Sequence, residues 1–404
     1  MTMLLDYLLD SVIRTGTLKV IDADGRIHTY NEGNGKAVTI RLHDEALHWK
    51  LFFNPTLYIG EAYMDGLLTI EEGTLQDFID LCGLNLPTLE AHPVLNASQR
   101  ISKLARRIQQ YNPRGVASGR VAHHYDLSNT LYELFLDEDL QYSCGYFTGN
   151  EQTLEQAQAN KKRHIASKLV LDRVGLKVLD IGSGWGGLAI YLARLAEADV
   201  TGITLSSEQH KAARRRAVEF GVADRVEFHL RDYRDETEEY DRIVSVGMFE
   251  HVGVTHYREF FTKLKELLKT DGIALLHSIA RMEPPGNTNP WIRKYIFPGG
   301  YCPAMSEVLA AAEDVGLWVT DIEILRLHYA ETLAEWCRRF ERNRDQAKKL
   351  YDERFCRMWE FYLASCEAGF RYTKQMVFQM QLTRSCDAAP LTRDYMLDRE
   401  RAYI

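Results

Sequence analysis

The segment with the clearest chemical meaning joins an apolar strand, one acid and four glycines: Leu179-Asp180-Ile181-Gly182-Ser183-Gly184-Trp185-Gly186-Gly187. The glycines at 182, 184 and 187 match the spacing G-x-G-x-x-G. In that spacing, the missing Cβ atoms let the backbone turn sharply and approach a ligand at a helix N-terminus. The alternative is a strand, turn and helix whose glycines serve packing alone. The spacing therefore predicts a nucleotide-binding turn.

The position of the acid indicates which nucleotide this turn holds. A dinucleotide site adds an acid about 20 residues further on, at the end of the second strand, and residues 200–205 contain none. Asp180 instead ends the first strand, in a D-x-G-x-G-x-G arrangement typical of methyltransferases, and Asp232-Tyr233 follows a third predicted strand. These positions predict S-adenosylmethionine as the ligand, with its adenine beside Asp232 and Tyr233.

Periodicity places this turn in a large α/β domain. Strands are predicted at about 176–181, 199–204, 226–230, 242–246 and 273–278, alternating with helical patterns, as in a Rossmann-like, doubly wound parallel sheet. The site should lie at the carboxyl ends of these strands. Residues 1–90 mix short alternating stretches with helical pieces, which predicts a smaller α+β domain. We expect an N-terminal domain at 1–90, a linker at 91–118 and a catalytic domain at 119–404.

Composition narrows the class of protein. The 404 residues are 46% hydrophobic and 26% charged with a net charge of −8, as in ordinary globular proteins with two domains. The N-terminal residues lack a basic flank and a following apolar run of membrane-spanning length, so we expect a cytoplasmic protein. Seven scattered cysteines without a C-x-x-C pair favour reduced thiols over disulfides or zinc, and we expect no metal.

A stretch without acids, residues 91–125, contrasts with the acidic chain. Its basic residues are Arg100, Lys103, Arg106, Arg107, Arg114 and Arg120, and Ile101, Leu104, Ala105 and Ile108 recur beside them at helical spacing. Such a basic amphipathic helix can bind anionic lipid headgroups, each cation contributing about 1 kcal/mol. A solvated linker helix is an equally open interpretation. Nucleic acid is not expected, because the chain is acidic and has no recognisable binding module.

Several further segments occur in a characteristic order: His124-Tyr125-Asp126, Gln141-Tyr142-Ser143-Cys144-Gly145-Tyr146-Phe147, Thr204-Leu205-Ser206-Ser207-Glu208-Gln209, Gly247-Met248-Phe249-Glu250-His251-Val252-Gly253, Leu276-His277-Ser278-Ile279 and Tyr295-Ile296-Phe297-Pro298-Gly299-Gly300. With the glycine turn they closely resemble the cyclopropane-fatty-acyl-phospholipid synthase family, which includes the mycolic acid cyclopropane synthases. The resemblance runs from about 119 to 384, and residues 60–66 resemble the N-terminal domain of the bacterial enzymes.

The resemblance implies methylene transfer from S-adenosylmethionine onto the cis double bond of acyl chains in membrane phospholipids. An alkene attacks without being deprotonated, so the enzyme contributes orientation, a dry pocket and stabilisation of the carbocation. Loss of a proton from the added methyl closes the ring, whereas loss from a neighbouring carbon leaves a methylated alkene. A fatty-acyl methyltransferase with a methyl-branched product and an inactive lipid-binding homologue are the alternatives.

The resemblance also implies a bicarbonate ion as the base, held by Cys144, Glu250, His277 and Tyr329 and by the backbone at Ile279. Judged from residue types alone, each side chain has another interpretation. Glu250 could cap the helix near Val254 or act directly as the base, and His277 could be a core histidine. Tyr329 could serve packing, and Cys144 could be a small buried hydrophobe.

For S-adenosylmethionine the resemblance assigns Tyr142, Ser143, Gly182, Gly184, Leu205, Gln209, Asp232 and Tyr233. Gln209 would hydrogen-bond the ribose, and a solvent-facing glutamine is the alternative. Trp291, Tyr295 and Phe297 could line an acyl tunnel, together with the stripe Phe355, Trp359, Tyr362, Leu363, Cys366 and Phe370; ordinary core packing is the rival. A homodimer, attached peripherally to the inner face of an anionic membrane, is also implied.

Overall fold

The computed structural model describes residues 3–33, 37–91, 128–149 and 151–403. The chain divides into two compact units. The N-terminal unit comprises Met1–Arg106, Asn287–Pro298 and Leu333–Lys374, and the large-sheet unit comprises Arg107–Gly286, Gly299–Thr332 and Gln375–Ile404. The sequence predicts 119–404 as one domain. In the structure, Asn287–Pro298 and Leu333–Lys374 group with the N-terminal helices instead. The boundaries at 90 and 118 remain predictions.

The large-sheet unit is built on seven strands in the order β10-β11-β9-β8-β5-β6-β7. Their bounds are β5 (Lys177–Ile181), β6 (Asp199–Thr204), β7 (Val226–Leu230), β8 (Tyr240–Val246), β9 (Leu268–Arg281), β10 (Trp318–Ile324) and β11 (Gln375–Thr383). β11 runs antiparallel to both its neighbours, and the other ladders are parallel. The predicted α/β class and doubly wound sheet are confirmed. β9 is longer than predicted because β11 pairs with it from Ile273 to Arg281.

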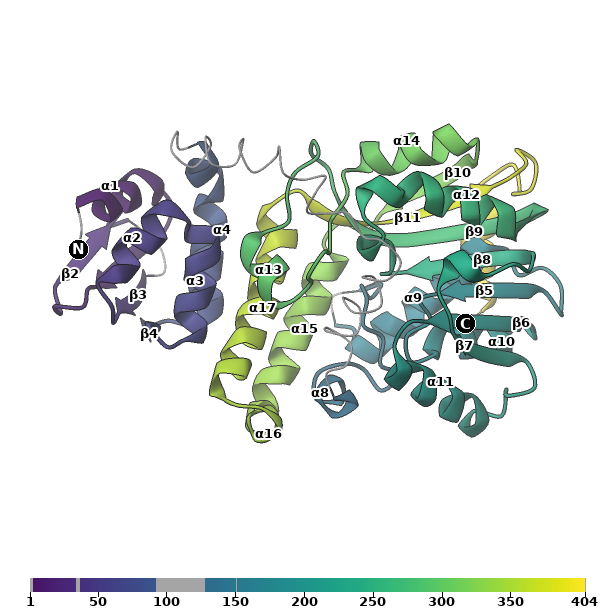
Figure 1. Cartoon of the computed structure of the whole chain (residues 1–404), viewed down its shortest axis with the longest axis horizontal. Coiled ribbons are helices and arrows are strands. Elements are labelled where there is room, and N and C mark those ends of the chain that lie inside the picture. The colour runs from purple at the N-terminus through teal and green to yellow at the C-terminus, as the bar shows by residue number, and fades with distance from the viewer. Residues whose placement is uncertain (1–2, 34–36, 92–127, 150, 404) are drawn as a thin grey trace. The chain divides into compact units, whose positions relative to one another are not determined.

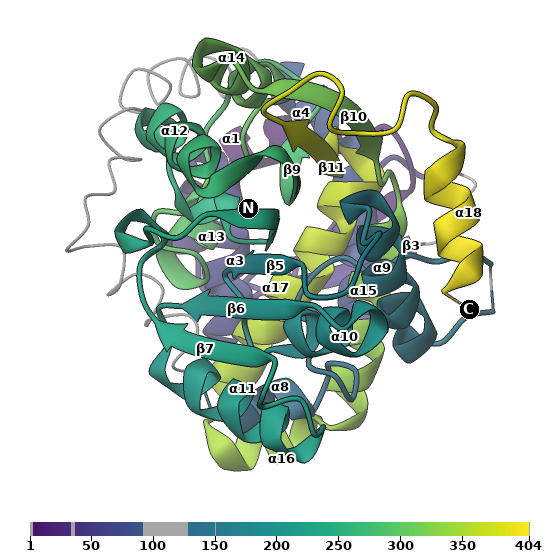
Figure 2. The ribbon, with the colours of Figure 1, turned by 90° about the vertical axis from the view of Figure 1, so that its right-hand side faces the viewer.

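Helices cover both faces of this sheet (Figures 1 and 2). On one face, α9 (Leu154–Leu169), α10 (Gly187–Ala196) and α11 (Ser207–Glu219) enclose a core with the β5 and β8 side chains Val178 and Val244. On the other, α12 (Tyr257–Leu267) and α14 (Met305–Val315) pack on Leu179, Ile243 and Leu276. Because side chains alternate along a strand, His277 and Asp180 belong to the face covered by α9.

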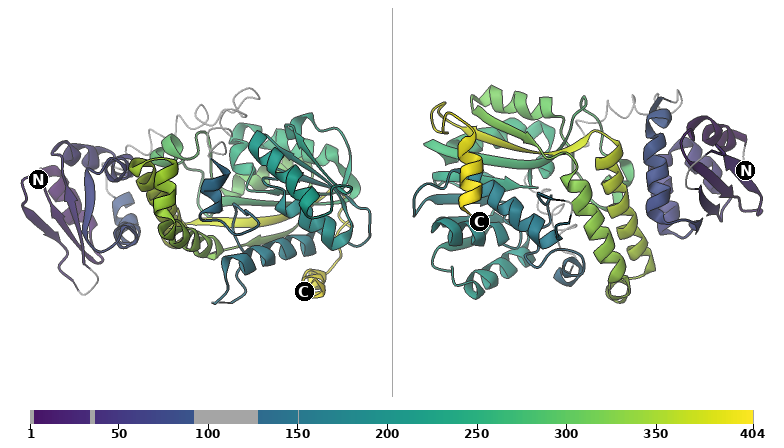
Figure 3. Two further views of the ribbon diagram at one scale, coloured as in Figure 1. Left: turned by 90° about the horizontal axis from the view of Figure 1, so that it is seen from below. Right: turned by 180° about the vertical axis from the view of Figure 1, so that it is seen from behind.

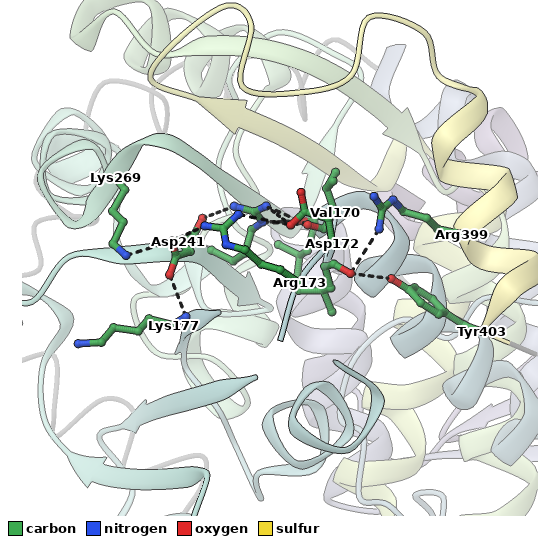
Figure 4. A network of polar contacts seen from close by, with 11 residues as sticks. Val170, Asp172, Arg173, Lys177, Asp241, Lys269, Arg399 and Tyr403 are labelled. Atoms are coloured by element: carbon green, nitrogen blue, oxygen red, sulfur yellow. Dashed lines mark hydrogen bonds and ion pairs between the residues drawn. The ribbon is translucent and has the colours of Figure 1, made fainter. Parts of the chain in front are cut away.

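The amino edge of the sheet is held by a polar network (Figure 4). The Asp241 carboxylate at the start of β8 accepts hydrogen bonds from the Lys177 backbone at 2.9 Å, Arg173 at 2.9 Å and Lys269 at 3.0 Å. Arg399 and Tyr403, at the C-terminal helix α18 (Asp394–Ala402), donate to the Leu171 carbonyl at 3.3 and 3.5 Å. These contacts tie α18 to the connection between α9 and β5, at the edge opposite the glycine turn.

The N-terminal unit contains a four-stranded sheet in the order β2-β1-β3-β4 and the helices around it. Its elements are α1 (Met3–Val12), β1 (Thr17–Ile21), β2 (Ile27–Tyr30), β3 (Ala37–Leu42), α2 (Ala46–Phe53), α3 (Pro55–Met64), β4 (Leu68–Glu72), α4 (Leu75–Ala91), α13 (Pro290–Tyr295), α16 (Arg344–Leu350) and α17 (Glu353–Tyr372). α17 packs on α3 and α4, and α13 packs on α3 (Figure 3). α15 (His328–Arg342) begins in the large-sheet unit and ends in this one. Of the helices described, none is long and apolar enough to cross a membrane.

Candidate functional site

The predicted nucleotide turn lies between β5 and α10. Gly182 and Gly184 have φ values of +85° and +54°, in the left-handed region that favours glycine. A Cβ on Gly182 would lie 2.9 Å from the Cβ of Met248, whereas one on Gly184 would meet no atom within 4 Å. The open space at Gly184, before the N-terminus of α10, suits a ligand that the backbone approaches closely.

Asp180, at the end of β5, is a buried acid with an unsatisfied oxygen. The side chain is 2% exposed, and its Oδ2 atom has no hydrogen-bond partner among the described residues. Burial raises the pKa of Asp180 to about 7, against the opposing effect of the positive charge of Lys161. A buried acceptor without a partner is costly, so this oxygen is available to a cationic or donor group of a ligand.

Lys161 on α9 is a site residue that sequence reasoning missed. Its ammonium is buried, and it donates to Gln141 Oε1 at 2.6 Å and Ser143 Oγ at 2.8 Å. Burial lowers the pKa of Lys161 to about 8, and nearby acids oppose that change. The predicted cofactor residue Ser143 is therefore held by a lysine whose charge also acts on Asp180.

A signal for Lys161 was present in the helical periodicity. The inward face of α9 carries Leu154, Ala157 and Ile165 at helical spacing, and Lys161 lies on that same face. A lysine at core spacing is almost never fully buried without a partner. A polar residue at an inward-facing position of an otherwise apolar helix face is thus a signal from which Lys161 could have been predicted.

Glu250 lies in the short 3₁₀ helix Phe249–His251 that follows β8. Its Oε1 atom accepts a 2.6 Å hydrogen bond from the Ile279 backbone, and its buried Oε2 has no partner among the described residues. Burial raises the pKa of Glu250 to about 7. The helix-cap interpretation is wrong, because Gly253 is the N-cap of the 3₁₀ helix that begins at Val254, and Glu250 bonds β9 instead. A direct hydrogen bond thus joins the Glu250 side chain to the Ile279 backbone.

His277 is 2% exposed and lies two residues before Ile279 on β9, so both side chains point to the same face of the sheet. Burial lowers the pKa of His277 well below its usual range, and the ring is therefore neutral. Its Nδ1 lies 3.2 Å from the side-chain nitrogen of Gln379 on β11. His277 is both a core histidine and a polar group near Glu250.

The segment that follows Cys144 contacts the first turns of α15, the helix that carries Tyr329. The Gly145 backbone donates to Thr332 Oγ1 at 2.9 Å, and Phe147 donates to His328 Nδ1 at 3.1 Å. Cys144 is 1% exposed, and burial raises the pKa of its thiol far above the usual range, so it is a neutral thiol rather than a nucleophile.

The start of α15 lies at the same edge of the sheet as Glu250. Leu325 donates its backbone N–H to Val377 at 2.8 Å, and Val377 is directly opposite Ile279 across the ladder of β9 and β11. Tyr329, 8% exposed, follows four residues after Leu325. Glu250 and the helical turn that carries Tyr329 thus both lie at the carboxyl edge of β9 and β10.

The remaining cofactor predictions, apart from Tyr142, lie along the carboxyl ends of β6 and β7. Gln209 is 5% exposed and accepts from Thr204 Oγ1 at 3.1 Å, so the alternative of a solvent-facing glutamine is wrong. Leu205 directly follows β6. Asp232 is bound by Arg234 through both carboxylate oxygens, at 2.9 and 2.6 Å, and Tyr233 packs edge-on against a phenylalanine of α12. Tyr142 packs edge-on against two aromatic rings.

The predicted tunnel residues belong to the N-terminal unit. Trp291 is 1% exposed and packs edge-on against Phe361 at a centroid distance of 4.8 Å, and the Tyr295 hydroxyl donates to Glu61 at 2.9 Å. Phe297 packs edge-on against Tyr362 of α17. These contacts are core packing within that unit, and a role in lining a tunnel stays a prediction. His124 and residues 92–118 of the basic segment lie outside the described residues.

Comparisons with known proteins find relatives over most of the chain. The family model described as mycolic acid cyclopropane synthetase matches residues 114–380, and a domain of unknown function matches residues 6–85. A probable fatty acid methyltransferase of Pseudomonas putida is 36% identical over 84% of this chain and 86% of its own length. The cyclopropane-fatty-acyl-phospholipid synthase of Escherichia coli K12 is 36% identical over 88% of this chain and 90% of its own.

Solved structures agree with the sequence relatives. The mycolic acid cyclopropane synthase CmaA1, crystallised with SAH and CTAB, has a TM-score of 0.63 and 32% identity, covering 67% of this chain and 99% of that one. Since the family model spans more than half of the chain and the relatives cover most of it, the assignment follows. The chain belongs to the mycolic acid cyclopropane synthetase family of S-adenosylmethionine-dependent methyltransferases.

Proposed function

We propose that the protein is a cyclopropane fatty acid synthase that acts on cis-unsaturated acyl chains of membrane phospholipids. The observation that carries the proposal is the 36% identity to the E. coli cyclopropane-fatty-acyl-phospholipid synthase over 88% of this chain, a share larger than the 66% matched by cyclopropane mycolic acid synthase 3 of Mycobacterium tuberculosis. The longer match to the E. coli enzyme extends into the N-terminal residues of this chain. This extension favours a phospholipid over a mycolate substrate.

The residues present fit S-adenosylmethionine. When bound, this co-substrate supplies an electrophilic methyl group on a sulfonium ion. Three residues would hold it: Gly184, which leaves open space beside the backbone, Asp180, whose unsatisfied Oδ2 can accept from a donor or cation, and Gln209, whose buried amide can bond hydroxyl groups. Lys161 keeps Ser143 and Gln141 in place, and the Gln141 amide lies next to Gly187 of the glycine turn.

The residues at the β9 edge also fit a bicarbonate ion. When bound there, bicarbonate would supply a base for the proton released on ring closure. The thiol of Cys144 and the neutral ring of His277 are uncharged groups that can donate to an anion, as the Tyr329 hydroxyl can. Glu250 keeps one buried oxygen without a partner, and this oxygen can accept an O–H.

Glu250 can also act directly as the base and take the proton itself. The Ile279 N–H holds Oε1 at 2.6 Å and leaves Oε2 as the atom that receives a proton. A carboxyl group with a pKa near 7 is matched to proton transfer at neutral pH. Dependence of the reaction on added bicarbonate separates these two versions.

The test is to incubate the purified protein with S-adenosylmethionine and liposomes of cis-monounsaturated phospholipid, with and without bicarbonate, and to analyse the fatty acids by gas chromatography–mass spectrometry. A product heavier by one CH₂ without a double bond is expected, and its formation should need bicarbonate. A product of that mass that keeps its double bond would instead indicate a fatty acid methyltransferase, the activity named for the P. putida relative. No product would contradict the proposal.

The pH dependence follows from the raised pKa of Glu250. Protonated Glu250 cannot accept a proton, so kcat/KM should rise with pH and reach half its plateau at about pH 7. Rates are measured at a fixed bicarbonate concentration from about pH 5.5 to about pH 8.5. Asp180→Asn should keep this rise, which would exclude Asp180, the other carboxyl group with a pKa near 7, as its source. A flat profile would exclude Glu250 as the titrating group.

We further propose peripheral contact with the inner face of an anionic membrane through the N-terminal domain and the basic segment at 91–118. Trp49 and Phe53 on α2 are 50% and 60% exposed, beside Lys50, and exposed aromatic and basic groups suit a membrane interface. In flotation assays the protein should bind anionic vesicles more than neutral ones, and less so at high salt. Equal binding to both kinds of vesicle would argue against the electrostatic part.

The family resemblance implies a homodimer, and we propose this assembly for the protein. Light scattering after size-exclusion chromatography measures the mass directly. A mass of one chain at assay concentration would overturn it.

A further inference from the structure

A row of three polar side chains crosses three neighbouring strands on the face covered by α9. Glu323 on β10 is directly opposite Gln379 on β11, and Gln379 is directly opposite His277 on β9. Directly opposite residues of an antiparallel pair share a face and touch. Gln379 is completely buried, and His277 and Lys168 are 2% and 1% exposed.

Lys168 on α9 determines which way the Gln379 amide points. Its Nζ donates to Gln379 Oε1 at 2.7 Å and also bonds the carboxylate of Glu323. Burial lowers the pKa of Lys168, but the charge of Glu323 and its hydrogen bond oppose that change. Burial alone would raise the pKa of Glu323, but hydrogen bonds from His164 and Lys168 hold it at about 2, so the two groups meet as ammonium and carboxylate. An ammonium has only donors, so the atom of Gln379 facing it is the oxygen.

The other end of the amide then determines the His277 tautomer. The Gln379 nitrogen, which can only donate, lies 3.2 Å from His277 Nδ1. Nδ1 must accept this hydrogen bond and carries no proton. Because the ring is neutral, its proton lies on Nε2. The hydrogen bond at one ring nitrogen thus sets the state of the other.

We propose that Gln379, oriented by Lys168, is a positioning residue that holds His277 with its proton on Nε2, so that His277 enters the site as a hydrogen-bond donor. The catalytic consequence rests on the proposed function, in which an anionic base needs donors around it. The tautomer itself does not depend on that function, and the two can be tested separately.

The test uses the full chain labelled with ¹⁵N-histidine, with the His277 signals identified by their loss in His277→Gln. The wild-type ring should show a protonated Nε2 and an unprotonated Nδ1. Gln379→Glu replaces the donor by an acceptor, so the proton should move to Nδ1. Gln381→Glu is the matched control: this buried glutamine lies two residues along the same strand and donates to the Lys168 carbonyl at 2.6 Å and to Tyr395 at 2.7 Å, and it should leave the His277 signals unchanged.

Turnover gives the second readout. Gln379→Glu should lower kcat about 10- to 100-fold, as is usual for residues that orient a functional histidine, with little change in S-adenosylmethionine affinity. If Gln379→Glu does not fold, Gln379→Met removes the donor at similar size, and the single Nε2-protonated tautomer should be lost. A wild-type ring with its proton on Nδ1, or unchanged His277 signals in a folded Gln379 variant, would overturn the assignment. A shifted tautomer with unchanged turnover would overturn the donor role alone.

Discussion

Glu250→Gln should lower kcat by about 10²- to 10⁴-fold, the usual contribution of a group that moves a proton in the transition state. The amide is nearly the same size as the carboxylate, and its oxygen can still accept the 2.6 Å hydrogen bond from the Ile279 backbone. What the variant loses is the second acceptor atom, which is buried and has no partner among the described residues. The fold should therefore survive while proton transfer fails.

Cofactor affinity should stay nearly constant in the same variant, because the proposed role of Glu250 comes after methyl transfer begins rather than in binding adenosine. Isothermal titration with S-adenosylhomocysteine measures the affinity, and product formation under saturating substrate measures kcat. Glu259→Gln, which neutralises a partly exposed carboxylate on α12, is the control for a change of charge. A Glu250→Gln enzyme with the wild-type rate would remove Glu250 from the mechanism.

Lys161→Met should weaken S-adenosylmethionine binding by about 10- to 100-fold, since hydrogen bonds to a charged group contribute about 1.5–3 kcal/mol each. Methionine fills a similar volume but donates nothing, so Ser143 and Gln141 lose the contacts at 2.8 and 2.6 Å that orient them. Asp180 also loses the positive charge of Lys161, which lowers its pKa, so the carboxyl group should be mostly protonated at neutral pH. Both changes act on groups assigned to the cofactor.

The measurement is the dissociation constant of S-adenosylhomocysteine, accompanied by a thermal melt to show that the variant is folded. Lys211→Met, which removes a lysine that is 72% exposed on α11, is the control and should change neither quantity. The weakened binding should also depend on pH less steeply than in the wild type, because Lys161 has a pKa near 8. Unchanged affinity in folded Lys161→Met would show that Lys161 serves only packing.

The sheet was predictable because each of its central strands is a short apolar run bounded by turn residues. The predicted strands at 199–204 and 226–230 coincide with β6 and β7, and 176–181 differs from β5 by one residue. The glycines at 182 and 184 adopt the positive φ values for which glycine is needed. Local patterns of this kind carry their own physical cause, and no distant partner is required to recognise them.

The buried polar face of α9 was not predicted. Helical spacing shows which residues of α9 face inward, but Lys161 and Lys168 can be tolerated there only because their partners come from elsewhere. The Gln379 amide that Lys168 orients is 211 residues away along the chain, and the His277 ring that this amide contacts is a further strand across the sheet. Such partners follow from strand order and register, which periodicity does not contain.

The division into units shows the same limit. The apolar stripe of α17 is recognisable from spacing alone, and tunnel lining and core packing were both open interpretations. The structure places Trp359 and Tyr362 in the N-terminal unit with Phe297, because α17 packs on α3 and α4. An apolar stripe in the sequence indicates that a helix has a buried face, but it does not indicate which surface packs against that face.

The sequence by itself thus determined the fold class, the glycine turn with Asp180, and the family to which the chain belongs, because these depend on residues close together in the chain. Only the tertiary structure decided that Glu250 bonds Ile279, that Lys161 holds Ser143, and that Gln379 faces His277. The physical reason is that hydrogen bonds depend on distance and direction in space. Those are set by how strands pair and how helices cover them, over separations that no local pattern spans.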